Sequence, residues 1–206
     1  GAIDPNEDYG NEGLSWQKDS SWGSYHVTTL HAYELVILKN ALIYSDNIYF
    51  AKAALKIGKD TLKDQFDNLL FGKNLDFTFG LTASSYGSEG FTSEIQLADS
   101  GYGQGEMMVN PVHMATIYTA FSNKGNMLHP YLIKQKGSKK QVLREHVFSN
   151  DAVKTVNDAM KQVISNPNGT GHAAQIDGID LKGKTGTAEI KQSQTDTKGT
   201  ELGWFV

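Results

Sequence analysis

Apolar positions recur at helical spacing through the middle of the chain. Between about residues 32 and 42 an apolar side chain returns every three or four positions, and the polar stretch 44–47 then interrupts the pattern. Two further helices are predicted over 47–57 and 61–71, because each repeats the same spacing and is followed by a glycine. The middle of the chain is therefore predicted to be helical.

The second half mixes helical and strand-like patterns. A short helix is predicted over 92–99, and Asn110-Pro111 marks the start of another that runs to about 123, since Asn is a good cap and Pro suits the first helical position. A long helix follows from Ser149 or Asn150 to about 164. Strands are expected at 130–134 and 141–147, and at 179–192 paired with 201–206; the first 30 residues suggest loops and short strands. Helices in the middle and strands towards the end predict an α+β fold.

Composition narrows the function without identifying it. The 206 residues are 39% hydrophobic with a net charge of −4, which suits one large domain or two small ones and gives little support to nucleic-acid binding. No run of 18 apolar residues and no signal-peptide pattern is present. The absence of cysteine excludes thiol nucleophiles and zinc ribbons, and the six histidines show no metal-binding spacing. We therefore expect neither metal nor cofactor.

One stretch matches a phosphate-binding loop letter for letter. Residues 178–185 fit the pattern G-x-x-x-x-G-K-[ST], yet their interior alternates like a strand and Asp180 would repel phosphate. No apolar strand precedes them. We interpret the match as accidental.

The same lysine belongs to a second pattern. Ser45-Asp46-Asn47 lies between two predicted helices, and Lys184-Thr185-Gly186 lies in a predicted strand. S-D-N and K-T-G, together with S-x-x-K, form the signature of penicillin-binding proteins and class A β-lactamases. Either triplet alone is more simply a helix cap or an exposed strand. Both in this order, with helical sequence between them, favour the catalytic interpretation.

The chain resembles the transpeptidase domain of class B penicillin-binding proteins, especially low-affinity members of Gram-positive cocci. The resemblance rests on 13–19, 45–51, 97–106 and 183–189, of which 97–106 is the most specific. It implies an antiparallel sheet flanked by helices, with an active-site groove between the sheet edge and an all-helical lobe. We expect a single, partial domain over 1–206, truncated at both ends, with a helical lobe at about 31–125 and a sheet-associated part at about 126–206.

The resemblance assigns three catalytic residues. It implies that Ser45 relays a proton towards the leaving amine of an acyl transfer through a serine ester. Asn47 would hydrogen-bond the substrate backbone or orient the lysine of the nucleophile motif. Lys184 would supply positive charge near Ser45 and the substrate carboxylate.

Four residues are assigned to substrate binding in the same way. Thr185 would donate its hydroxyl to the substrate carboxylate, and Gly186 would let the substrate backbone lie against the strand. The backbone N–H of Thr187 would be an oxyanion donor, worth about 3 kcal/mol in comparable sites. Gln104, in the 97–106 motif, completes the set.

The nucleophile itself is expected upstream of the chain. The one S-x-x-K match, Ser15 to Lys18, lies among aromatic residues and glycines instead of at the head of an apolar helix, so we reject it. We therefore expect this chain alone to be inactive and the complete protein to bind β-lactams covalently. The expected partners are peptidoglycan stem peptides and β-lactams, with membrane contact only through an N-terminal anchor and an active site on the extracytoplasmic face of the bacterial membrane.

Alternatives remain within the same fold. A β-lactamase would need a deacylating glutamate; Glu94 loosely fits, but Ala98 stands where an asparagine is expected, and a glutamate at a helix start is the simpler interpretation. A penicillin-sensing or non-catalytic binding domain is the alternative that stays open.

Two further stretches have simple structural interpretations. Asn168-Gly169-Thr170 matches a glycosylation sequon, but a plain turn is the simpler interpretation. The aromatic residues near Trp22 are expected to pack against one another.

Overall fold

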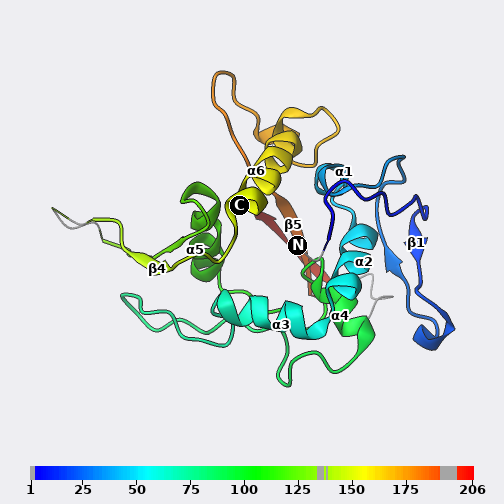
Figure 1. Ribbon diagram of the computed structural model, residues 1–206, viewed down its shortest axis with the longest axis horizontal. Helices are drawn as coiled ribbons and strands as arrows, with labels where there is room; N and C mark the ends of the chain where they lie inside the picture. The colour runs from blue at the N-terminus through cyan, green and yellow to red at the C-terminus, as the bar shows by residue number, and fades with distance from the viewer. Residues whose placement is uncertain (1–2, 134–136, 138, 191–198) are drawn as a thin grey trace.

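The chain forms six α-helices and three small antiparallel sheets in the part that a computed structural model describes, which is residues 3–133, 137, 139–190 and 199–206 (Figure 1). The helices are α1 (Leu38–Tyr44), α2 (Asn47–Ile57), α3 (Lys59–Asn68), α4 (Glu94–Ser100), α5 (Pro111–Ser122) and α6 (Asn150–Ser165), with 3-10 turns η1 (Ser20–Trp22) and η2 (His172–Ala174). The strands are β1 (Ser15–Trp16), β2 (Val27–Thr28), β3 (Met127–Leu128), β4 (Val142–Arg144), β5 (Thr185–Ile190) and β6 (Thr200–Phe205). This mixture confirms the predicted α+β class.

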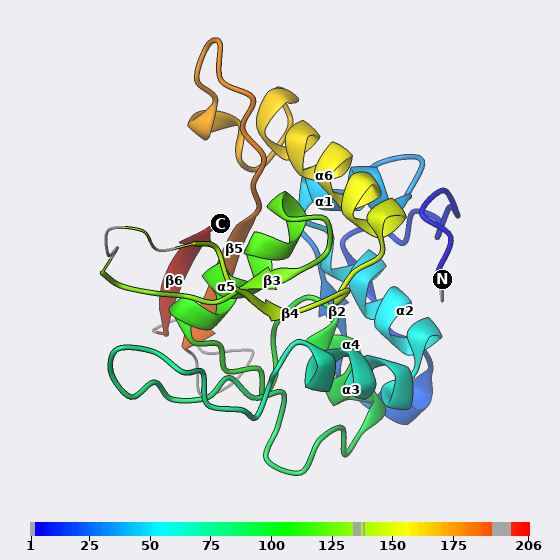
Figure 2. The same cartoon turned by 60° about the vertical axis from the view of Figure 1, so that its left-hand side comes forward.

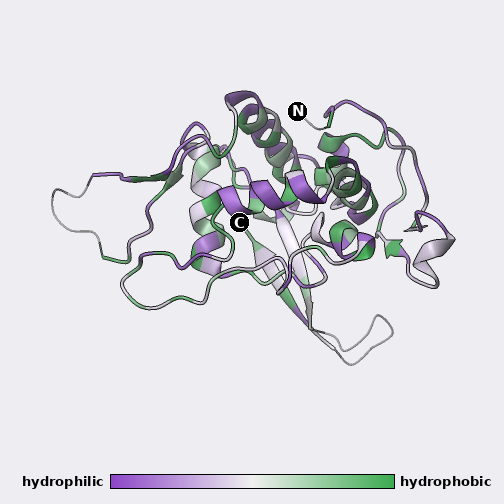
Figure 3. Cartoon of the chain, turned by 60° about the horizontal axis from the view of Figure 1, so that its bottom comes forward, coloured by the Kyte–Doolittle hydropathy of each residue, from purple (hydrophilic) through white to green (hydrophobic). Residues whose placement is uncertain are grey.

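The helices pack through their apolar faces. α6 lies along α1, and α2 lies against α4 (Figure 2). α6 is strongly amphipathic, and its inward stripe consists of Val153, Ala159, Met160, Val163 and Ile164. By contrast, α3 buries no residue completely and is largely hydrophilic (Figure 3). None of the helices in the described part of the chain has the length and apolar character needed to cross a membrane.

The buried side chains form three clusters. One joins the α3 end to α5 and β3, and contains Leu69, Phe71, Ile117, Ala120, Met127 and Val147. The second joins the aromatic N-terminal region to α2 and α4, and contains Trp22, Val27, Ile48, Ala51 and Ala98. The third joins α1 to α2, and contains Val36, Ala41, Tyr49 and Ala53. Trp22 therefore packs in the core, as predicted, and α2 is shared between two clusters.

β5 and β6 form the longest ladder. Their register runs from Thr185 opposite Phe205 to Ile190 opposite Thr200. The predicted pairing of these two segments is confirmed, although β5 begins later than the predicted strand at 179, and residues 191–192 of that prediction lie outside the described residues. In Figure 2, β5 is the strand of this hairpin that lies on the side of the helices, and β6 is the outer strand.

The first predicted helix starts later than its apolar pattern suggests. α1 begins at Leu38, because Leu35 has a left-handed φ of 58° and Ile37 is extended. The N-terminal segment holds this stretch: Tyr9 N–H donates to the carbonyl of Val36 at 3.0 Å. A backbone pairing that is distant in sequence thus overrides the helical spacing of 32–37.

The predicted strand 130–134 is wrong where the structure describes it. Pairing with the β4 segment stops at His129, whose N–H donates to the carbonyl of Gln141 at 2.8 Å. The next residue, Pro130, has no N–H to continue a ladder. Tyr131, Leu132 and Ile133 are exposed, and Lys134 lies outside the described residues.

His113 is a buried structural residue of α5. It is 1% exposed, its Nε2 lies 2.7 Å from the carbonyl of Leu69, and its Nδ1 lies 2.8 Å from Ser84 Oγ. Since a carbonyl only accepts, Nε2 carries the proton and Nδ1 accepts from Ser84. Burial lowers the pKa of His113, so the neutral imidazole ties α5 to the end of α3.

Candidate active site

The Ser45 hydroxyl and the Lys184 ammonium meet in space although 139 positions separate them in the sequence. Lys184 Nζ donates to Ser45 Oγ at 2.8 Å. The prediction that these two groups face each other is therefore confirmed. The contact joins the helical part of the chain to the start of β5.

Ser45 occupies a sharp joint between α1 and α2. It has left-handed φ and ψ values of 55° and 54°, and its N–H caps the α1 carbonyls of Ala41 and Leu42. A non-glycine residue rarely adopts this conformation, so the surrounding structure has to hold it. The joint ends α1 and starts α2 within two residues, which places the hydroxyl at a fixed point between the helices.

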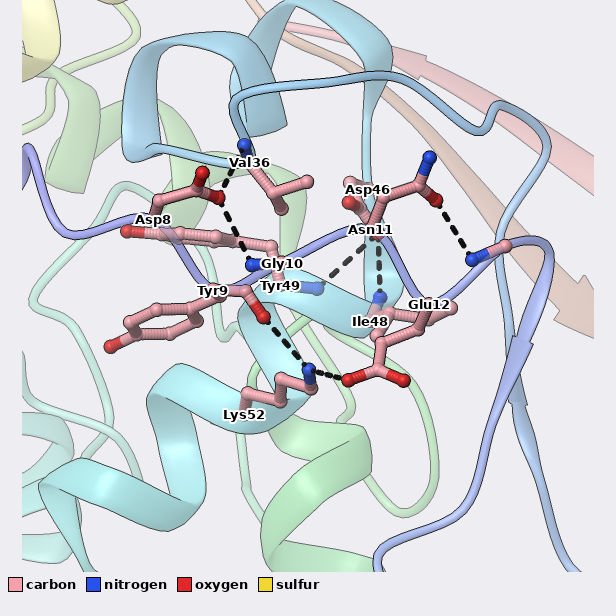
Figure 4. Close-up of polar contacts among 11 residues, drawn as sticks. Asp8, Tyr9, Gly10, Asn11, Glu12, Val36, Asp46, Ile48, Tyr49 and Lys52 are labelled. Carbon is pink, nitrogen blue, oxygen red and sulfur yellow. Dashed lines mark hydrogen bonds and ion pairs between the residues drawn. The ribbon is translucent and has the colours of Figure 1, made fainter.

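Asp46 anchors this joint from the inside. Its Oδ1 accepts from the N–H groups of Ile48 and Tyr49, and its Oδ2 accepts from the Tyr33 hydroxyl at 2.8 Å. Figure 4 shows the carboxylate above the first turn of α2, with the N-terminal strap 8–12 across that helix. Asp46 is only 4% exposed. The middle residue of the S-D-N triplet is thus a buried helix cap.

The strap 8–12 holds α2 from the other side. Lys52 donates to the carbonyl of Tyr9 at 3.1 Å and forms an ion pair with Glu12 at 2.5 Å. The Tyr9 ring also stacks on Tyr49, with centroids 4.7 Å apart. These contacts appear together in Figure 4. The strap therefore restrains the helix that begins next to Ser45.

Lys184 is held at the head of β5. Its backbone exchanges two hydrogen bonds with Val206, and the preceding Gly183 N–H donates to the carbonyl of Met160 in α6. A Cβ at Gly183 would lie 2.9 Å from the carbonyl oxygen of Val206 and 2.9 Å from the Phe205 ring, so glycine is strongly favoured there. Burial lowers the pKa of Lys184 to about 8. Its ammonium can therefore lose a proton near neutral pH.

The strand beyond Lys184 presents one backbone edge to the helices. Because Lys184 and Val206 form a hydrogen-bonded pair, the antiparallel alternation turns the N–H and C=O groups of Thr185 and Thr187 away from β6. Lys184 Nζ donates to the Thr185 carbonyl at 2.8 Å. Gly186 lies between these two residues, and a Cβ there would meet Trp204 at 3.3 Å.

Gln104 reaches the same edge from the 101–105 loop. Its Nε2 donates to the Thr187 carbonyl at 2.9 Å. The loop is fixed at its base by Asp99, which accepts from the hydroxyls of Tyr25 and Tyr102, and whose carbonyl accepts from Gln104 N–H at 3.0 Å. Burial raises the pKa of the Asp99 carboxyl although both phenols lower it. Sequence reasoning did not find this Asp99–tyrosine cluster.

Asn47 follows the joint in the first turn of α2. Its side-chain Nδ2 donates to the carbonyl of Thr28 in β2 at 2.9 Å. The structure thus brings Ser45, Lys184 and the β5 residues together, with Gln104 at one end and Asn47 beside Ser45.

The rejected alternatives have other structural roles. Ser15 lies in β1, whereas Lys18 pairs with Glu94 at the start of α4. Glu94 also accepts from the Trp22 indole at 3.1 Å, as a helix-start carboxylate. Thr185 of the phosphate-loop pattern opens a strand, whereas a phosphate loop requires a helix at that point. In the described part of the chain, no group of three or more histidine or acidic residues is placed to hold a metal ion.

One hydroxyl next to the site has no place in the sequence motifs. Thr185 Oγ1 donates to Thr170 Oγ1 at 2.7 Å. Thr170 belongs to the Asn168-Gly169-Thr170 stretch, which forms the predicted turn. Its position between Gly169 and Gly171 was the available signal, because paired glycines often mark a close backbone approach.

Comparison with known proteins agrees with this geometry. The family described as penicillin binding protein transpeptidase domain matches residues 1–206. Penicillin-binding protein 3 of Bacillus subtilis is 40% identical over 207 residues, covering 100% of this chain and 31% of the relative. Peptidoglycan D,D-transpeptidase FtsI of Escherichia coli is 29% identical over 167 residues, covering 80% and 27%. The chain thus spans about a third or less of these curated relatives.

The fold agrees as well. The apo structure of the TP domain of penicillin-binding protein 3 from Burkholderia pseudomallei superposes with a TM-score of 0.80 at 22% identity, covering 98% of this chain and 59% of that one. At that identity the likeness bears on the fold alone. With the family match over the whole chain and the paired S-D-N and K-T-G motifs, the chain belongs to the penicillin-binding protein transpeptidase domain family.

Proposed function

We propose that the protein containing this domain is a serine D,D-transpeptidase that cross-links peptidoglycan stem peptides. The observation that carries the proposal is the Ser45–Lys184 hydrogen bond at the head of an open strand edge. The Escherichia coli relative is named a peptidoglycan D,D-transpeptidase, which supports the same activity.

In this proposal Ser45 and Lys184 form a proton relay. Lys184 donates to Ser45 Oγ, so the hydroxyl proton of Ser45 is directed away from the lysine and can pass to the leaving amine. Lys184 then returns a proton to Ser45, which its pKa of about 8 permits near neutral pH. Asn47 binds the substrate backbone or orients the lysine of the nucleophile motif.

The β5 edge binds the acyl donor. Thr187 N–H points to the open edge and stabilises the oxyanion, while the Thr185 hydroxyl and the Lys184 ammonium bind the substrate carboxylate. Gly186 has no side chain, so an extended peptide can lie against the strand there. In the free protein the Gln104 side chain donates to the Thr187 carbonyl, and in the complex it contacts the substrate that lies along this edge.

The nucleophilic serine belongs to an S-x-x-K motif outside this chain, so the chain alone is inactive. In the complete protein that serine forms the ester with stem peptides and the covalent adduct with β-lactams. The proposed location is the extracytoplasmic face of the bacterial membrane, reached through an N-terminal anchor.

Intact-mass measurement after incubation with benzylpenicillin tests the proposal. The full-length protein should gain one penicillin mass, and it should release the terminal residue of a stem peptide that ends in a D,D-dipeptide. The 206-residue chain should gain nothing. A stoichiometric adduct on Ser15, or no adduct on the full-length protein, would refute this assignment.

A further inference from the structure

Thr170 lies where three elements meet. Its hydroxyl accepts from Thr185 Oγ1 at 2.7 Å at the start of β5. Its backbone N–H donates at 3.1 Å to the carbonyl of Ile43, two residues before Ser45 in α1. The turn that carries it follows directly from α6. Thr170 is therefore tied through its backbone to the Ser45 joint and through its side chain to the Lys184 strand.

The residues on either side fix this position. A Cβ on Gly169 would lie 2.1 Å from the carbonyl oxygen of Val163, and one on Gly171 would lie 2.8 Å from Ile164. Gly171 N–H also donates to the Val163 carbonyl at 3.2 Å. The contact at Gly169 is with backbone, so only glycine allows the turn to approach the end of α6 this closely there. The turn is thus built to hold its central residue, although Thr170 itself is exposed.

The hydrogen bonds leave the Thr170 proton available. Lys184 Nζ lies 3.4 Å from Thr185 Oγ1, and Thr185 donates its own proton to Thr170. Thr170 accepts that bond, so its hydroxyl proton is directed elsewhere. An ammonium and two hydroxyls therefore stand in a row at the head of β5, with the exposed hydroxyl at the end.

We propose that Thr170 is a second hydroxyl of the carboxylate-binding subsite and helps to determine which acyl donors and β-lactams react. The proposal rests on the proposed function. Without a ligand, Thr185 donates its proton to Thr170 at 2.7 Å. When a carboxylate binds, that proton turns to one carboxylate oxygen, the Thr170 proton goes to the other, and Lys184 supplies the charge. The ligand class is an acyl donor with a free carboxylate, and Thr170 is an exposed residue that such a ligand can reach.

The test compares Thr170→Val and Thr170→Ser in the full-length protein. Valine keeps the shape and the backbone hydrogen bond to Ile43 but removes the hydroxyl, whereas serine keeps the hydroxyl. The second-order acylation rate constant is measured with benzylpenicillin and with its methyl ester, which lacks the carboxylate charge. The matched control is Thr200→Val, an exposed threonine in β6.

Thr170→Val should slow acylation by benzylpenicillin about tenfold, because a hydrogen bond to a charged group is lost. With the methyl ester, which has no carboxylate charge to lose, Thr170→Val should react within about twofold of the rate of the wild-type protein with the same ester. Both Thr170→Ser and Thr200→Val should react like wild type with either compound. An unchanged rate with the acid, an equal loss with the ester, or a loss in the serine variant would overturn the role of Thr170. A wild-type protein that is not acylated at all would overturn the proposed function and this inference with it.

Discussion

Two of the contacts between the helical part of the molecule and the β5 segment are built differently. Ser45 and Lys184 meet through an ammonium and a hydroxyl, at a helix joint anchored by the buried Asp46. Gln104 meets Thr187 through a neutral amide, from a glycine-rich loop. The first contact involves a charged group that can transfer a proton, whereas the second is a neutral hydrogen bond from a loop that Asp99 holds at its base. We therefore expect the first contact to affect the chemistry and the second to affect mainly the position of the strand edge.

Replacing the cation should have the largest effect. Lys184→Met in the full-length protein should reduce the rate constant of β-lactam acylation about a thousandfold, because it removes the proton donor and the charge together. Lys154→Met is the matched control, since Lys154 pairs with Asp158 on the exposed face of α6. A loss below about tenfold, which is no more than a single hydrogen bond contributes, would contradict the catalytic assignment.

Asp46, which anchors the Ser45 joint, should make the largest contribution of these residues to the free energy of unfolding. Asp46→Ala removes a helix cap and leaves the Tyr33 hydroxyl without its acceptor, so we expect the free energy of unfolding to fall by about 3 kcal/mol. Asp46→Asn keeps an acceptor oxygen and should cost about 1 kcal/mol. Urea denaturation measures both. Equal losses in the two variants would show that charge, and not the cap, stabilises the joint.

The rate of acylation should depend on pH through Lys184 at the first contact, and not through the neutral Gln104 contact. Because burial lowers the pKa of Lys184 to about 8, the ammonium is lost as pH rises through that value. Acylation by a carboxylate-bearing β-lactam should then fall about tenfold per pH unit above it. The Lys184→Arg variant stays charged, so its acylation rate should not decline in this pH range, although that rate should be lower than the wild-type rate at neutral pH. A rate that rises through pH 8 would make Lys184 a base.

The loop contact should have the smallest effect. Gln104→Ala removes one neutral hydrogen bond to the Thr187 carbonyl, so acylation should slow about fivefold with little change in stability. Gln104→Glu cannot donate and places a negative charge near that carbonyl, so its loss should be larger. Faster acylation in the alanine variant would mean that Gln104 obstructs the edge.

The sequence predicted most of the elements and the central contact of the site. Capping residues such as Asp46 and Ser149 fixed helix starts, since their chemistry is local. The motif pairing placed Ser45 beside Lys184 although no local signal connects them. Two predictions failed. A backbone hydrogen bond from the N-terminal strap to Val36 keeps 32–37 out of the helix, and the lack of an N–H on Pro130 ends the pairing after His129.

The missed parts of the site share one property. Thr170 and the Asp99–tyrosine cluster act through contacts between segments that have no common motif. The predicted turn at Thr170 and the predicted short helix that contains Asp99 were both correct as local structure. Their role depends on which distant side chain each one meets, and spacing within one stretch of sequence does not contain that information.

The left-handed backbone at Ser45 narrows what substitution can achieve there. Glycine and asparagine would suit the conformation but would lose the hydroxyl, whereas threonine would keep the hydroxyl and suffer most, because a β-branched side chain is poorly tolerated at positive φ. The backbone and the chemistry therefore favour different residues at this position, and serine is the compromise that satisfies both.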